Sequence, residues 1–131
     1  GAIEHRDTWL QRLLALCGDL GLPVTAALAN DPFFGRGGRI MADSQRERQL
    51  KFELLIPVND SGKPTACMSF NYHEEHFGGT WGLRTAEGAT AHTACVGFGM
   101  ERLALAILRH HGTQPEAWPA GLRDALHWTG T

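Results

Sequence analysis

A glycine-rich segment near the C-terminal end, Gly97-Phe98-Gly99-Met100-Glu101-Arg102, has the clearest chemical potential in this sequence. Glycines at the end of a strand let the chain turn sharply into a helix and leave room for a flat or phosphorylated ligand. Arg102 would then lie near the helix N-terminus, where the helix dipole favours anions and a guanidinium can hold a phosphate through two hydrogen bonds. An ordinary strand-to-helix junction with a surface arginine would have the same pattern, so the segment alone leaves both interpretations open.

Potential metal ligands form a second pattern, which consists of His73, His76, His92 and Cys95. Imidazole and thiolate are ligands that zinc prefers. Because residues three apart on a strand face opposite sides, both members of each pair could reach one ion only where the backbone bends. Three alternatives therefore remain: a structural zinc site made of all four residues, a shared site in which Cys95 is one ligand, and a buried strand thiol.

Two smaller groups could line a ligand pocket. Glu53 interrupts an apolar strand candidate, and a carboxylate there is typical of the solvated face of a sheet. In a pocket the same carboxylate could hold an ammonium group or a magnesium-bound nucleotide. Asn71, Tyr72 and Trp81 combine polar and aromatic groups around one loop, and they could shape a small pocket or simply cover the sheet.

The elements that must position these residues follow from hydrophobic periodicity and turn signals. Asp7 or Thr8 can cap the first helix, and Gly112 ends a later one. The predicted helices span residues 9–20, 39–50, 100–110 and 120–127; the predicted strands span 24–29, 52–58, 65–72 and 90–98; and 74–82 is predicted to be an irregular loop. A helix, hairpin-connected strands and a further helix favour an α+β fold, an antiparallel sheet with flanking helices in a single domain over residues 1–131.

Composition narrows the class of protein. The chain has 131 residues, 43% hydrophobic and 20% charged, which is enough for one domain with a buried core. The formal net charge of -2 argues against a free-standing nucleic-acid binder. No apolar run approaches the roughly 20 residues of a membrane span, and no signal peptide is visible. The three cysteines argue against a disulfide framework, so a cytoplasmic location is predicted.

Four stretches together resemble one family. Their order and spacing are similar to the C-terminal half of the amino acid:[carrier protein] ligases, which are related to the catalytic core of atypical zinc-dependent seryl-tRNA synthetases. Residues 95–108 resemble motif 3 of a class II aminoacyl-tRNA-synthetase-type ATP site. The stretches are NDPFFGRGGR (30–39), KFELLIPV (51–58), PTACMSFNYHEEHFGGTWGL (64–83) and AHTACVGFGMERLALAILRHHG (91–112).

The resemblance implies an activity. Such ligases activate a small amino acid, such as glycine or alanine, with ATP to give an aminoacyl-adenylate. They then transfer the aminoacyl group to the phosphopantetheine thiol of a carrier protein. The expected cofactors are therefore ATP, Mg and Zn, with the zinc ion binding the amino group of the substrate. The expected partners are the amino acid and the carrier protein, and neither tRNA nor a membrane is expected.

The resemblance also assigns roles to residues. Arg102 matches the catalytic motif 3 arginine that holds the triphosphate of ATP, and Cys95 matches a zinc ligand. Glu53, Gly97 and Gly99 would complete the cofactor site. Adenylate formation needs positioning and charge stabilisation rather than a side-chain nucleophile, so no cysteine is expected to act as one. The substrate-binding candidates are Asn71, Ser69 and Trp81.

The sequence also departs from the family pattern. Motif 1, motif 2 with its α-phosphate-binding arginine, and two further zinc ligands would all lie before residue 1. The chain is therefore expected to form no adenylate by itself and to be part of a ligase. The alternatives are a catalytically inactive shortened paralogue that acts as a carrier-protein or protein-binding module, and a small zinc protein. An apolar strand edge exposed by such a division predicts a homodimer or pairing with a missing N-terminal half.

Overall fold

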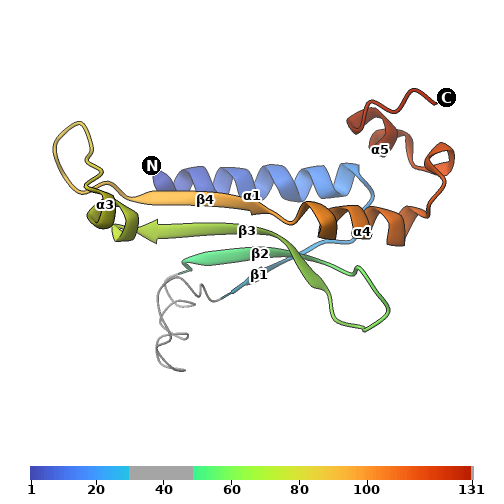
Figure 1. Cartoon of the computed structure of the whole chain (residues 1–131), viewed down its shortest axis with the longest axis horizontal. Helices are drawn as coiled ribbons and strands as arrows, with labels where there is room; N and C mark the ends of the chain where they lie inside the picture. The colour runs from blue at the N-terminus through green and yellow to red at the C-terminus, as the bar shows by residue number, and fades with distance from the viewer. Residues whose placement is uncertain (30–48, 131) are drawn as a thin grey trace.

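The computed structural model of the chain describes residues 1–29 and 49–130, so the helix predicted over 39–50 lies outside the described residues except for its last two, which are not helical. Four strands form one antiparallel sheet whose spatial order is the chain order (Figure 1). A long helix runs alongside the strands. The predicted antiparallel α+β architecture is therefore confirmed. The strands are β1 (Thr25–Leu28), β2 (Lys51–Ile56), β3 (Thr65–Glu74) and β4 (Thr93–Phe98), and the helices are α1 (Ala2–Asp19), α3 (His76–Trp81), α4 (Met100–His111), η2 (Pro115–Ala117) and α5 (Ala120–Ala125).

One face of the sheet is apolar and carries the core. Alternate residues of β2 and β3, among them Leu54 and Phe70, point to this face and are fully buried. They join one hydrophobic cluster with Leu10, Leu13 and Cys17 of α1. Burying each large apolar side chain contributes about 1.5–3 kcal/mol, so this face provides most of the sheet's stabilisation.

The opposite face is polar, because the intervening residues of the same strands point there. The strand register aligns Glu53 with Ser69, and Ser69 with Gly97. Two residues further along, on the same face, it aligns Lys51 with Asn71, and Asn71 with Cys95. We refer to the side of the sheet that carries these residues as the polar face.

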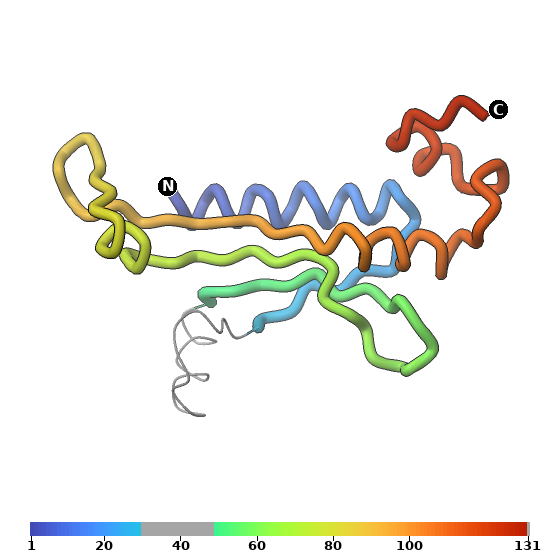
Figure 2. The backbone as a smooth tube through the Cα atoms, in the orientation of Figure 1, coloured from blue at the N-terminus to red at the C-terminus, as the bar shows by residue number. Residues whose placement is uncertain are grey.

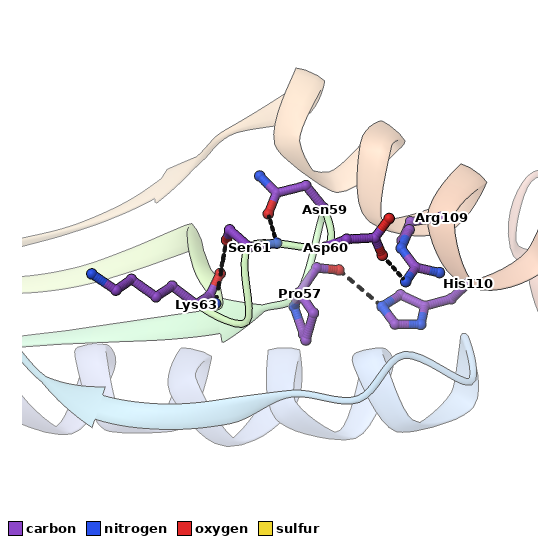
Figure 3. Close-up of polar contacts among 7 residues, drawn as sticks. All are labelled: Pro57, Asn59, Asp60, Ser61, Lys63, Arg109 and His110. Atoms are coloured by element: carbon purple, nitrogen blue, oxygen red, sulfur yellow. Dashed lines mark hydrogen bonds and ion pairs between the residues drawn. The ribbon is translucent and has the colours of Figure 1, made fainter.

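Helix α4 is tied to the loop that joins β2 and β3. His110 Nε2 lies 2.9 Å from the carbonyl oxygen of Pro57, and Arg109 forms an ion pair with Asp60 (Figure 3). Within the loop, the backbone N–H of Ser61 donates to the side chain of Asn59 at 3.0 Å. These contacts fix the direction in which α4 leaves the sheet. Figure 2 shows this loop and the end of α4 near one end of the sheet, and α3 at the other.

The loop predicted over residues 74–82 was wrong in part, because α3 (His76–Trp81) forms within it. Gly78 is buried there, and a Cβ atom added to it would lie 2.0 Å from the carbonyl oxygen of Ala91. The glycine content that indicated an irregular loop instead allows a short helix to pack closely against Ala91, just before β4. Gly82 then ends the helix with φ of 66°.

Two other boundaries differ from expectation by more than two residues. Helix α1 begins at Ala2 rather than at residue 9, and Glu4 pairs with the amino terminus at 2.9 Å in its first turn. Strand β4 begins at Thr93 rather than at residue 90, because Thr90 forms an isolated bridge with Arg84 outside the strand. Among the described residues, no helix is both long and apolar enough to cross a membrane.

Candidate active site on the polar face of the sheet

A pocket of about 290 Å³ lies where the polar face meets the start of α4. It brings together five of the eight residues predicted to form a site. These five come from three strands and a helix start that are far apart in the sequence, so the tertiary fold assembles them. The predicted residues in the lining are Glu53, Ser69, Gly97, Gly99 and Arg102, and the others are Lys51, Ala66, Cys67, Met68 and Phe98.

Gly97 and Gly99 lie so close to neighbouring atoms that a side chain at either position would be crowded. A Cβ atom on Gly97 would lie 3.0 Å from Ser69 Oγ, so a side chain there would press on the hydroxyl across the sheet. A Cβ atom on Gly99 would lie 3.2 Å from both the Arg102 side chain and the carbonyl oxygen of Cys67. Gly99 also donates its N–H to that oxygen at 2.8 Å. Both glycines therefore leave space that other side chains use.

Arg102 folds back from the first turn of α4 over the start of β3. Its Nη1 donates to the carbonyl oxygen of Ala66 at 2.8 Å, and the guanidinium remains accessible. A cation in the first turn of a helix is unfavourable with respect to the helix dipole, which prefers anions there. The arginine and the helix start therefore concentrate positive potential on the same pocket, an arrangement suited to an anionic group.

The carboxylate of Glu53 faces this positive potential from β2. It pairs with Lys51 at 3.2 Å, and both side chains are largely buried, at 24% and 13% exposure. Lys51 is not among the residues predicted from the sequence, although its position two residues before Glu53 places both on the same face. The pocket thus carries two cations and one carboxylate around a cluster of small residues.

Cys95 lies next to Asn71 on the same face. The Nδ2 of Asn71 is 3.3 Å from the sulfur and 3.4 Å from Ser69 Oγ, so the three side chains link the sulfur to the pocket. Asn71 is 5% exposed, and its Oδ1 has no hydrogen-bond partner among the described residues. The thiol of Cys95 itself is exposed, which excludes the alternative of a buried strand thiol.

The four-ligand structural zinc site does not form. His92 lies against Tyr72, whose hydroxyl bonds to its Nδ1, and it approaches Glu75 at 3.6 Å. Within the described part of the chain, no three His, Cys, Asp or Glu side chains are grouped so that they could hold one metal ion. Of the four candidates, His73 and Cys95 are brought together, with 3.5 Å between Nε2 and Sγ. The exposed thiol of Cys95 fits the role of one zinc ligand, but these residues do not supply a complete site.

Trp81 is not brought to the pocket. It ends α3 and is 73% exposed, whereas the pocket lies where β3 and β4 approach the start of α4. Its substrate-binding role stays a prediction that the pocket geometry does not support.

Cys67 lies beside the pocket but is 1% exposed. Burial raises the pKa of its thiol, and the nearby Arg102 only partly opposes this effect. A thiol held in its neutral form is a poor nucleophile, so Cys67 is poorly suited to that role.

The chain is similar over nearly its whole length to curated ligases. It is 56% identical over 123 residues to amino acid–[acyl-carrier-protein] ligase 1 of Bradyrhizobium diazoefficiens, covering 94% of this chain and 38% of that protein. It is 52% identical over 130 residues to ligase 2 of the same organism, covering 96% of this chain and 39% of that protein. The resemblance to the amino acid:[carrier protein] ligases is confirmed. The chain spans less than two fifths of the length of these relatives, and no protein-family model matches it.

More distant similarity supports the fold. The type-2 serine–tRNA ligase of Methanopyrus kandleri is 29% identical over 129 residues, covering 92% of this chain and 24% of that enzyme. A crystal structure of the M. kandleri seryl-tRNA synthetase in complex with an A. aeolicus tRNA superposes with a TM-score of 0.76 at 23% identity. The match covers 98% of this chain and 26% of that one. The synthetase-like fold expected for this ligase family is therefore confirmed.

Proposed function

We propose that this chain forms part of the active site of an ATP-dependent ligase that activates a small amino acid of the glycine or alanine class as its adenylate. The aminoacyl group would then pass to the phosphopantetheine thiol of a carrier protein. The observation that supports this proposal most directly is the pocket at the start of α4, where Arg102, Gly99 and Ser69 meet.

In the proposed reaction, Arg102 and the α4 N-terminus bind the triphosphate of ATP. Charge that develops on the phosphates is stabilised by groups held in place before the reaction starts, which is the main source of rate enhancement in such chemistry. Because Gly97 and Gly99 carry no side chains, Ser69 and Arg102 can occupy the space beside them, next to the proposed phosphate position. Glu53 orients the bound nucleotide from the opposite side, and Lys51 holds the Glu53 carboxylate in place.

The amino acid would bind beside the phosphates, on the part of the polar face that carries Ser69, Asn71 and Cys95. When bound, zinc would hold the substrate amino group and magnesium would neutralise phosphate charge. Cys95 would contribute one zinc ligand. Asn71 and Ser69 would orient the carboxylate so that it attacks the α-phosphate and displaces pyrophosphate, since reaction depends on alignment of the two reacting groups.

A chimera tests the proposal. The matching segment of the B. diazoefficiens ligase 1 is replaced by this chain, and amino-acid-dependent ATP–pyrophosphate exchange is measured with glycine and alanine. We expect exchange from the chimera and none from the isolated chain. A folded chimera without exchange would contradict the proposed function, and robust exchange by the isolated chain would contradict the need for further segments.

Exposed apolar residues on α4 support the predicted pairing with another polypeptide. Met100, Leu105 and Leu108 are 67%, 52% and 41% exposed on a helix whose opposite side packs into the core. Sedimentation analysis of the isolated chain should show a dimer or a larger assembly. A monomer at high concentration would contradict this expectation.

A further inference from the structure

A buried histidine lies against the sulfur of Cys95. The Nε2 atom of His73 is 3.5 Å from Sγ, and its Nδ1 atom is 3.1 Å from the hydroxyl of Thr93. His73 is only 5% exposed, whereas Cys95 is exposed. The imidazole is therefore held from within the protein, and the thiol is presented outward.

The backbone is distorted where it presents this imidazole. The register between β3 and β4 shifts between Tyr72 and Glu74, which leaves His73 as an extra residue opposite the strand. Glu74, the next residue, has a φ of 51°, which is uncommon for a residue other than glycine. Bulges of this kind re-aim a side chain and occur next to active sites.

Aromatic packing adds a further restraint on the ring. The imidazole and the ring of Phe77, from α3, form a T-shaped pair with 4.7 Å between ring centroids and an interplanar angle of 84°. The short helix α3 is itself held close to β4 by the absence of a side chain at Gly78. Ring orientation therefore depends on three elements, β3, β4 and α3.

We infer that His73 is the positioning residue for Cys95. In the inferred arrangement, the Thr93 hydroxyl donates to Nδ1, and the imidazole proton is therefore on Nε2 and directed toward Sγ. Asn71 Nδ2 at 3.3 Å supplies a second N–H to the same sulfur. Two N–H donors stabilise a negatively charged sulfur in one position, as expected for a thiolate that binds a divalent, thiophilic cation. The inference rests on the proposed role of Cys95 as a metal ligand and adds the residues that orient it.

The tautomer of His73 can be observed without any metal. Nitrogen-15 NMR of the imidazole in the intact chain should show the proton on Nε2. In Thr93→Val, which keeps the shape of the side chain but removes the hydroxyl donor, that preference should weaken. A proton found on Nδ1 in the unmodified chain would overturn the inference.

Cadmium binding then tests the effect on the sulfur. Cd²⁺ alone is titrated into this chain and into the chimera described above, and the sulfur-to-cadmium charge-transfer absorption is followed. Loss of a residue that orients a metal ligand typically weakens metal affinity by about 10- to 100-fold, which is the effect expected for His73→Leu. His73→Gln, which returns an N–H near the position of Nε2, should recover most of the affinity. His92→Gln is the matched control, because His92 bonds to Tyr72 instead, and it should leave cadmium binding unchanged.

The outcomes separate the inference from the proposed function. If His73→Leu binds cadmium as tightly as the unmodified protein while Cys95→Ser abolishes binding, Cys95 is a ligand and the inference is wrong. If Cys95→Ser changes nothing, or neither protein binds cadmium, the metal role of Cys95 fails and the inference fails with it.

Discussion

The two faces of the sheet differ in how their side chains are used. On the apolar face, Leu54 and Phe70 are fully buried against α1, and each contact serves packing. On the polar face, the neighbouring positions of these strands pair Glu53 with Ser69, and Asn71 with Cys95, across the sheet. Because side chains alternate along a strand, two adjacent residues can serve stability and chemistry separately. Substitutions on the two faces should therefore have different consequences.

The largest effect is expected on the apolar face. Phe70→Ala removes a fully buried ring and should lower the free energy of unfolding by about 3–5 kcal/mol, as measured by denaturant titration. Ser69→Ala, the matched change one residue away on the polar face, should alter stability by less than about 1 kcal/mol. Equal losses from the two substitutions would contradict the division between the faces.

Arg102→Ala should have the next largest effect, on activity rather than on stability. Removal of one preorganised donor from a charged transition state typically lowers the rate by about 10²–10³-fold. ATP–pyrophosphate exchange by the chimera should fall by this factor. Arg109→Ala, near the other end of α4, serves as the control and should leave exchange unchanged. A similar loss in both variants would indicate damage to the helix instead.

Gly97→Ala should have a smaller effect, a loss of stability caused by a clash with Ser69 on the neighbouring strand. The added methyl group would lie 3.0 Å from Ser69 Oγ, and such overpacking typically costs about 1–3 kcal/mol of stability. Thermal unfolding of the single variant and of Gly97→Ala with Ser69→Ala measures the coupling. The double variant should recover most of the loss, because the second change removes the crowded hydroxyl. Additive losses would show that the clash lies elsewhere.

The smallest effect is expected at the surface ion pair between Arg109 and Asp60. Their side chains are 48% and 88% exposed, so solvent and salt screen the interaction. Arg109→Ala should change the free energy of unfolding by about 0–1 kcal/mol, and the difference should shrink as salt is added. A loss as large as that from Phe70→Ala would mean that the β2–β3 loop is a main determinant of stability.

Sequence patterns were sufficient to predict the positions of most strands and helices, and the strand-to-helix junction between Gly97 and Arg102. The 3.6-residue periodicity of α4 and the alternation in β2 and β3 reflect local geometry, so the described strands and α4 were predicted within a few residues. The short helix α3 was missed because its glycines have the same composition as a loop. Its formation depends on close packing of Gly78 against Ala91, which lies after the loop that joins α3 to β4.

For the candidate site, too, some features could be predicted from the sequence and others could not. Residue types and spacing by themselves supported the family resemblance and made Arg102 and Cys95 site candidates, because these are properties of the chain as written. Only the tertiary structure decided that His92 lies against Tyr72, that Trp81 lies away from the pocket, and that His73 meets the sulfur of Cys95. Which side chains meet depends on strand register, on a bulge and on helix docking. These features involve residues distant in the sequence, and no local pattern specifies them.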